Sequence, residues 1–165
     1  METPANMVQM TTKADFAAMY ETCVNELYRF ALYYLGSPEE AEDAVQETAL
    51  EAFRSRHTLR EKAKFKAWIF AILAAKCKRS VKGLILKRSL ASLAAQEGAP
   101  DGDLLKAVEI REAVAGLSPE ERLIILLAAQ GFKGAEIASI LAKPEGTVRS
   151  KRSRALEKLK GLINS

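Results

Sequence analysis

The tetrapeptide Ser-Pro-Glu-Glu occurs twice in this sequence, at residues 37–40 and 118–121. Each copy supplies a serine that can cap a helix, a proline suited to the first helical position, and a glutamate three residues after the cap. Each copy therefore predicts a full capping box and the start of a helix. Because one copy lies in each half of the chain, both halves must contain helices.

Apolar residues recur at three- and four-residue steps along most of the chain, which is the spacing of one helix face. This spacing predicts a first helix over 16–35, ended by Gly36, a second from Pro38 to about Arg56, and a third beginning near Phe65. The stretch between the second and third helices has no clear period and is expected to form a loop. No segment shows the convincing alternation of a strand, so the predicted fold class is all-α.

The pattern weakens over residues 83–103, which end in the Gly- and Pro-containing stretch "AAQEGAPDGD". This composition is typical of a linker. It divides the chain into two small helical domains, over 10–82 and 104–165. In the second domain, helices are expected over 119–130, 134–142 and 144–160.

Charge is arranged in blocks rather than evenly. Residues 62–91 contain nine lysines and arginines and no aspartate or glutamate, and residues 133–165 contain eight cations against three acids. The remaining blocks, 1–61 and 92–132, are acidic. Alternating blocks predict that each domain has one face for an anionic partner and another for a basic partner.

Several function classes lack the residues that they need. Cys23 and Cys77 lie far apart and His57 is the only histidine, so neither a disulfide nor a metal site is expected. No phosphate-binding loop or cofactor motif occurs, and we expect no enzyme. The longest apolar run, residues 68–75, is far shorter than the roughly 20 residues that span a bilayer. With no signal peptide or lipidation motif, we expect a cytoplasmic protein without membrane insertion.

The end of the chain has the arrangement of a helix-turn-helix, in which a short helix and a tight turn, "KPEG", precede a basic helix. No acid occurs between Thr147 and Leu156, although a solvated helix usually alternates its charges. At 100° per residue, one side of the basic helix is expected to pack. That side carries Val148, Ala155, Leu156 and Leu159. The opposite side is expected to meet DNA and carries Thr147, Ser150, Lys151, Arg154 and Lys158.

Four segments together resemble one protein family. They are "AEDAVQETALEAF" (41–53), "FKAWIFAIL" (65–73), "LSPEERLIILL" (117–127) and "EIASILAKPEGTVRSKRSRALEKL" (136–159). In order and spacing they are similar to the extracytoplasmic-function sigma factors of bacterial RNA polymerase, from about residue 16 to 162. The resemblance implies that the first domain, domain two, binds core polymerase and melts the minus-ten promoter element. It implies that the second, domain four, reads the minus-thirty-five element.

Asp43, Gln46 and Glu47 stand at i, i+3 and i+4, so they form one polar patch on the second helix. Such a patch could bind arginines of a partner helix without a deep pocket. The resemblance implies that these three residues bind core polymerase.

Cations and aromatic residues mix around the start of the third helix. Phe65 and Trp68 lie on its apolar stripe and are expected in the core rather than stacked on bases. Phosphate contacts that hold a separated strand are expected from Arg60, Lys62, Lys64 and Lys66.

For the basic helix, the resemblance implies DNA contacts at Arg149, Ser150, Ser153 and Arg154. Lys151 and Lys158 join this set because they share the stripe expected to be exposed. Arginine can pair with guanine edges or bind phosphate, and serine can bind a base edge or the DNA backbone. The sequence therefore does not assign base contacts and phosphate contacts to particular residues.

The chain departs from the family pattern at several positions. Ala75 and Arg79 replace the usual asparagine and aspartate late in the third helix, so promoter contacts there are expected to differ. Lys133 replaces a capping Ser or Thr, which leaves Glu136 without its capping partner. Arg152 replaces an aliphatic residue and must extend to the surface or bind phosphate.

The sequence therefore predicts an RNA polymerase sigma factor that binds core polymerase and promoter DNA, with an anti-sigma protein as a further partner. Two alternatives stay open. One is a sigma-like decoy that only sequesters an anti-sigma protein, favoured by Ala75 and Arg79 but opposed by the intact basic helix. The other is a helix-turn-helix repressor, opposed by the polar patch over 43–47.

Overall fold

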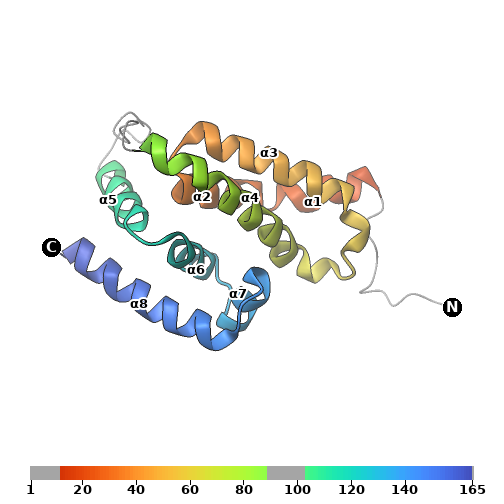
Figure 1. Ribbon diagram of the computed structural model, residues 1–165. Coiled ribbons are helices and arrows are strands. Elements are labelled where there is room, and N and C mark those ends of the chain that lie inside the picture. Colours follow the sequence, from red (N-terminus) through yellow and green to blue (C-terminus); the bar gives the residue numbers. More distant parts are fainter. Residues whose placement is uncertain (1–11, 89–102, 165) are drawn as a thin grey trace.

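The computed structural model describes residues 12–88 and 103–164. Every regular element in these two ranges is helical, which confirms the all-α fold class (Figure 1). The α-helices are α1 (Lys13–Glu21), α2 (Val24–Leu35), α3 (Pro38–Arg54), α4 (Phe65–Arg88), α5 (Asp103–Ala115), α6 (Pro119–Ala129), α7 (Gly134–Leu141) and α8 (Glu145–Asn164). Two short 3-10 turns, η2 (Arg56–Thr58) and η3 (Lys62–Lys64), lie within the expected loop. None of the described helices is long and apolar enough to cross a membrane.

The expected linker lies largely outside the described residues. Helix α4 continues through Arg88, so residues 83–88 of the predicted linker are helical. Residues 89–102 are not described, and α5 begins at Asp103.

Helices α3 and α6 begin where the repeated tetrapeptide predicts. The capping box is complete at Ser118, whose hydroxyl accepts from the Glu121 backbone N–H at 3.3 Å and whose own N–H donates to the Glu121 carboxylate at 3.1 Å. At Ser37 the structure shows the serine half, in which the hydroxyl accepts from the Glu40 N–H at 3.3 Å. Gly36 ends α2 with a φ of 77°, a left-handed conformation that favours glycine.

The first predicted helix is interrupted. Helix α1 ends at Glu21 and α2 begins at Val24. At the break, the Thr22 hydroxyl donates to the Met19 carbonyl at 2.6 Å, a local bond of the kind by which threonine competes with helix geometry. Cys23 follows with φ −131° and ψ 2°, which are not helical values. The apolar spacing continues across the break, so the spacing did not predict that the helix would be interrupted.

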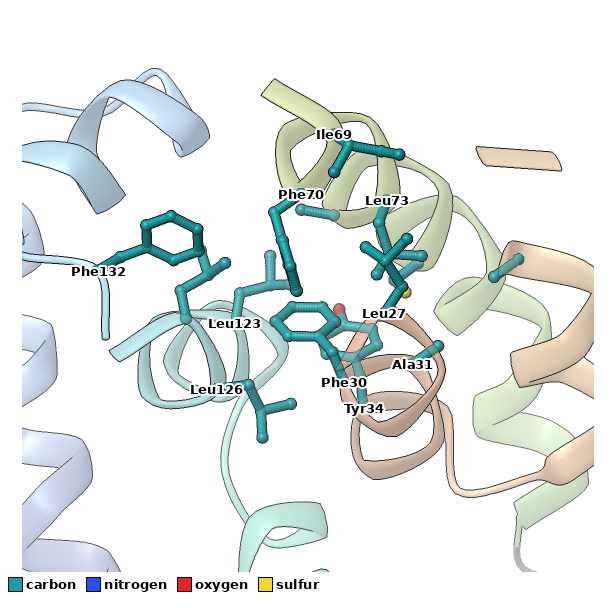
Figure 2. Close-up of a cluster of buried hydrophobic side chains, with 14 of the residues drawn as sticks. Leu27, Phe30, Ala31, Tyr34, Ile69, Phe70, Leu73, Leu123, Leu126 and Phe132 are labelled. Carbon is teal, nitrogen blue, oxygen red and sulfur yellow. The ribbon is translucent and has the colours of Figure 1, made fainter. Parts of the chain in front are cut away.

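Helices α2, α3 and α4 pack into the larger part of the core. Leu27 of α2 and Leu73 of α4 are completely buried and lie next to each other (Figure 2). Phe30 meets Phe70 edge-to-face, with ring centroids 5.6 Å apart. Burying a side chain of this size stabilises the fold by about 1.5–3 kcal/mol.

Helices α5 to α8 lie along one side of this bundle and share its core (Figure 1). Phe132 reaches Phe70 of α4 with ring centroids 5.6 Å apart, and Leu123 lies beside the same aromatic cluster (Figure 2). The Arg122 guanidinium donates to the Tyr34 carbonyl, at the end of α2, at 2.8 Å. The two predicted domains are therefore packed together, an arrangement that the sequence did not predict.

Candidate nucleic-acid and protein-binding surfaces

The helix-turn-helix predicted from the sequence is formed by α7 and α8. Helix α7 ends at Leu141, and Ala142 adopts φ 55°, so the chain turns sharply before α8 begins at Glu145. Val148 and Ala155 of α8 are buried, which fixes the helix against α6 and α7. Leu156, expected on the packed side, is instead 44% exposed.

The opposite side of α8 carries four exposed polar residues. They are Arg149, Ser150, Ser153 and Arg154, the positions implied by the family resemblance. The Ser150 hydroxyl donates to the Gly146 carbonyl at 3.0 Å, so its lone pairs stay available to an external donor. Within the described residues, no carboxylate forms an ion pair with Arg149 or Arg154. We refer to these four residues as the α8 stripe.

Lys151 and Lys158 do not share the α8 stripe. Lys151 pairs with Glu120, and Lys158 pairs with Glu121 at 3.0 Å. Each lysine comes three residues after a buried residue, Val148 or Ala155, which is about 60° short of a full turn. Both therefore leave α8 on the flank that faces α6. The helical wheel did not predict this orientation of the two lysines, because it contains no information about acidic residues on the neighbouring helix.

The pKa values of both α6 carboxylates are lowered. Hydrogen bonds from Lys151 and then Lys143 lower the pKa of Glu120. Burial alone would raise the pKa of Glu121, but hydrogen bonds from Lys158 and Ser118 outweigh it and lower the value. Both groups are thus held as carboxylates at neutral pH.

Helix α7 begins differently from the prediction. The Glu136 carboxylate accepts from the Lys133 backbone N–H at 2.8 Å, so Glu136 has a capping partner and the expectation that it lacks one is wrong. The half of the capping box that is missing is the hydrogen bond from the Glu136 backbone N–H to the N-cap side chain. Lys133 cannot accept it, because an ammonium group accepts no hydrogen bond. Arg152, which was expected to extend to the surface or bind phosphate, is half-buried.

The polar patch on α3 lies on the outer face of the first bundle. Asp43, Gln46 and Glu47 are all exposed, while the residues between them on the inner face are buried. Leu50 continues the same face and is 57% exposed. Leu50 was not among the residues predicted from the sequence, although its position three residues after Glu47 places it on that face. Helices α3 and α8 lie on opposite sides of the molecule (Figure 1).

The cations near the start of α4 separate into two groups. Arg60, Lys62 and Lys64 are exposed. Lys66 is instead held between the packed bundles, donating to the Gln130 carbonyl at 3.1 Å and lying 3.8 Å from a Glu26 carboxylate oxygen. The structure thus places three of the four cations where an anion can reach them.

A cleft of about 560 Å³ lies between the η2–α4 region and α7. Arg60 and Lys64 line it on one side, and Glu136 and Ile140 line it on the other. Trp68 is half-buried and forms part of its wall, whereas Phe65 is buried as expected.

Ala75 and Arg79, the two departures on α4, are both exposed. They border a hollow of about 370 Å³ together with Lys76 and Glu51. Lys76 donates to the Glu51 carboxylate at 2.5 Å, and this hydrogen bond lowers the Glu51 pKa.

The cysteines do not approach a metal site in the part of the chain that the structure describes, where no cluster of three or more metal-ligating side chains occurs. Cys23 and Cys77 are both free and buried. Burial raises the pKa of Cys77 to about 12 and that of Cys23 to about 11.

Comparisons with known proteins agree with this geometry. Residues 19–84 match the family Sigma-70 region 2, and residues 107–159 match Sigma-70 region 4. The chain is 30% identical to the ECF RNA polymerase sigma factor SigL of Mycobacterium tuberculosis over 155 residues, covering 87% of this chain and 85% of SigL. It is 31% identical to EcfG of Rhodopseudomonas palustris over 151 residues, covering 85% and 80% of the two chains.

Solved structures show the same fold. The sigma factor RpoE of Bartonella quintana, in complex with the anti-sigma factor NepR, has a TM-score of 0.72 and 27% identity, covering 91% of this chain and 97% of RpoE. CnrH, in complex with the cytosolic domain of CnrY, has a TM-score of 0.72 and 19% identity, covering 93% and 90%. Neither a decoy nor a repressor is favoured by these matches. The bundle that carries the polar patch and the helix-turn-helix that carries the α8 stripe are sigma regions 2 and 4, and the chain belongs to the ECF sigma factors of RNA polymerase.

Proposed function

We propose that this sigma factor uses two separate helices, one in each sigma region, for its two partners. The outer face of α3 binds core polymerase, and the α8 stripe reads promoter DNA. The observation that carries the proposal is their separation, since α3 and α8 lie on opposite sides of the molecule (Figure 1). A chain with this layout can bind protein and DNA without one partner covering the site of the other.

The polymerase-binding face consists of Asp43, Gln46, Glu47 and Leu50. Its support is the exposure of three polar side chains around one exposed leucine. An exposed apolar side chain surrounded by polar groups is typical of protein interfaces. The acidic members suit a basic partner surface, with arginine able to bind a carboxylate through two hydrogen bonds.

The proposed DNA contacts lie in both modules. The α8 stripe contacts the minus-thirty-five element, and exposed Arg60, Lys62 and Lys64 bind phosphates near the minus-ten element. DNA contacts by Lys66, Lys151 and Lys158 remain predictions from the sequence. In the structure these three side chains bind other groups of this chain.

We also infer an anti-sigma partner, since RpoE, which shares this fold at 27% identity, was solved with NepR. Sigma factors act through polymerase and are generally not enzymes. We infer that this chain carries no catalytic step of its own and works in the cytoplasm, where polymerase transcribes the chromosome.

Competition for core polymerase tests the α3 face. Gln46→Ala together with Glu47→Ala should raise the concentration needed to displace a labelled wild-type chain from core polymerase at least tenfold, because both side chains are exposed and available to a partner. Glu112→Ala, which removes one exposed carboxylate from α5, is the control and should compete like wild type. Unchanged competition by the double variant, with helicity intact, would remove α3 from the interface.

A further inference from the structure

Three lysines of the helix-turn-helix gather around the first turn of α6. Lys143, in the turn before α8, lies 2.9 Å from a Glu120 carboxylate oxygen, and Lys151 binds the other oxygen of the same group. Lys158 donates to both oxygens of Glu121 at 3.0 and 3.1 Å. Two carboxylates therefore hold three of the cations of the DNA-binding unit.

The carboxylates are held more firmly than the lysines. Glu121 is only 7% exposed, and its Oε1 also accepts from the backbone N–H of Ser118. The side chain of Glu120 is 22% exposed, whereas those of Lys151 and Lys158 are 34% and 53% exposed. The lysines can reach solvent or a phosphate, whereas Glu121 is also held by the Ser118 backbone at the start of α6.

An ammonium group that is bound to a carboxylate does not neutralise a phosphate. Lysine contacts to phosphate strengthen binding to every DNA sequence alike, whereas contacts to base edges distinguish sequences. The α8 stripe has no acidic partner in the described residues, so it stays available. The two glutamates thus bind the three lysines, which would strengthen binding to any DNA sequence, and do not bind the α8 stripe, which is the candidate for reading bases.

We propose that Glu120 and Glu121 determine how strongly this sigma factor discriminates between DNA sequences, by withholding Lys143, Lys151 and Lys158 from the DNA backbone. This inference rests on the proposed function of α8 as the reading helix. Both acids are positioning residues, since they act on DNA only through the lysines. Their lowered pKa values agree with the proposal, because the carboxylates remain charged at neutral pH.

A purely structural role for the same ion pairs makes a different prediction. If the pairs only fix the angle of α8, breaking them should weaken binding to the promoter element and leave the salt dependence on unrelated DNA unchanged or shallower. If the pairs withhold lysines, breaking them should strengthen binding to unrelated DNA and steepen its salt dependence.

Glu120→Gln is the test, because Glu120 does not cap α6 as Glu121 does. Binding of the full chain to a scrambled duplex is measured by fluorescence anisotropy over a range of salt. Each freed lysine that reaches a phosphate should steepen the slope of log affinity against log salt by about 0.9. A fourfold dilution of salt should then widen the gain over wild type by roughly three- to fourfold per lysine. With polymerase bound, the ratio of affinities for promoter and scrambled DNA should fall.

Two further variants separate the lysines from net charge. Glu112→Gln makes the same charge change on α5 and should leave the slope at the wild-type value. Adding Lys151→Met to Glu120→Gln should remove about one unit of the extra slope, while Lys151→Met alone should change it much less. An unchanged or shallower slope for Glu120→Gln, with wild-type helicity, would overturn the inference and leave the proposed function standing. Failure of wild-type holoenzyme to bind promoter DNA would overturn both.

Discussion

Arg122 is the charged residue with the deepest structural role among those described above. It is 5% exposed and donates to three carbonyls, those of Tyr34 at 2.8 Å, Ala115 at 3.2 Å and Leu117 at 3.1 Å. Its guanidinium carbon also lies 5.2 Å from the centre of the Tyr34 ring. One side chain thus joins the end of α2 to both ends of the turn that leads into α6.

Arg122→Met should lower the free energy of unfolding by roughly 2–4 kcal/mol, because it removes the donor from three carbonyls, two of them in buried hydrogen bonds. Urea denaturation followed by circular dichroism measures the change. Arg149→Met, on the exposed face of α8, is the matched control and should stay within about 0.5 kcal/mol of wild type. Equal effects of the two substitutions would show that the Arg122 contacts contribute little.

Arg154 and Lys158 should differ in their effects on DNA binding. If Arg154 contacts a base edge, Arg154→Ala should cost about 1–3 kcal/mol on the promoter element and less on scrambled DNA. Lys158 is held by Glu121, so Lys158→Ala should change the salt slope by clearly less than one unit. Titrations of holoenzyme on both duplexes give these values. Equal losses on both duplexes for Arg154→Ala would make Arg154 a phosphate contact.

Single residues could be placed from the sequence where local geometry decides. Gln46 and Glu47 are exposed because their spacing fixes them on one helix face, and that face is opposite the apolar one. Lys151 was placed on the wrong flank because a long side chain follows its charge partner, and Glu120 lies 31 residues earlier in the chain.

At the scale of elements, the start of α7 is incompletely capped. Lys133 already has the extended backbone of an N-cap, with φ −81° and ψ 164°, and Glu136 already accepts its N–H. Lys133→Ser should therefore add the missing hydrogen bond and raise the free energy of unfolding by about 0.5–1 kcal/mol. Thermal denaturation detects this as a higher Tm. Lys160→Ser, on the exposed face of α8, tests for a general effect of losing a lysine and should give no increase.

The exposed leucine of α3 should affect binding rather than stability. Leu50 is 57% exposed, so Leu50→Ala should change the free energy of unfolding by no more than about 0.5 kcal/mol. If it is the apolar centre of the polymerase-binding face, affinity for core polymerase should fall by about 1 kcal/mol or more. Titration of labelled protein with core polymerase measures the loss. Wild-type affinity would exclude Leu50 from the contact.

The elements that the sequence predicted best are those whose ends carry their own signals. Ser37, Ser118 and Gly36 define helix ends through bonds or dihedral angles of their immediate neighbours. The break at Thr22 was missed because apolar residues keep their helical spacing on both sides of it. Apolar periodicity shows which helix face is buried. A short break that keeps the same face buried leaves the periodicity unchanged, so the break is not visible in the sequence.

At the scale of the whole molecule, the two sigma regions should unfold together, since Phe132 of one packs on Phe70 of the other. Phe132→Ala should destabilise the fold by about 3–5 kcal/mol. The single tryptophan, Trp68, lies in the first region, so its fluorescence reports on the region that does not carry the substitution. Its transition should shift by as much as the overall circular dichroism signal. A Trp68 transition that stays at the wild-type midpoint would show that the regions unfold independently.

The packing of the two regions had no signal in the sequence. The hydrogen bond from Arg122 to Tyr34 joins residues 88 positions apart. Phe132 also follows a glycine at the end of a helix, where it reads as a loop residue. Nothing in local spacing shows that two distant segments meet, so the sequence predicted two modules but not their contact.

This contact has a consequence for how promoters are occupied. Elements named for positions minus ten and minus thirty-five lie about 25 base pairs apart, or roughly 85 Å along the duplex. A packed chain of this length has a radius of gyration of only about 15 Å. If the two regions bind the two elements as proposed, regions that touch through Phe70 and Phe132 cannot reach both at once and must part first. The apparent affinity of the chain for a promoter is then its intrinsic affinity scaled by the fraction of open molecules. Under the proposed function, a molecule that holds both regions together would lower promoter occupancy without covering the α8 stripe.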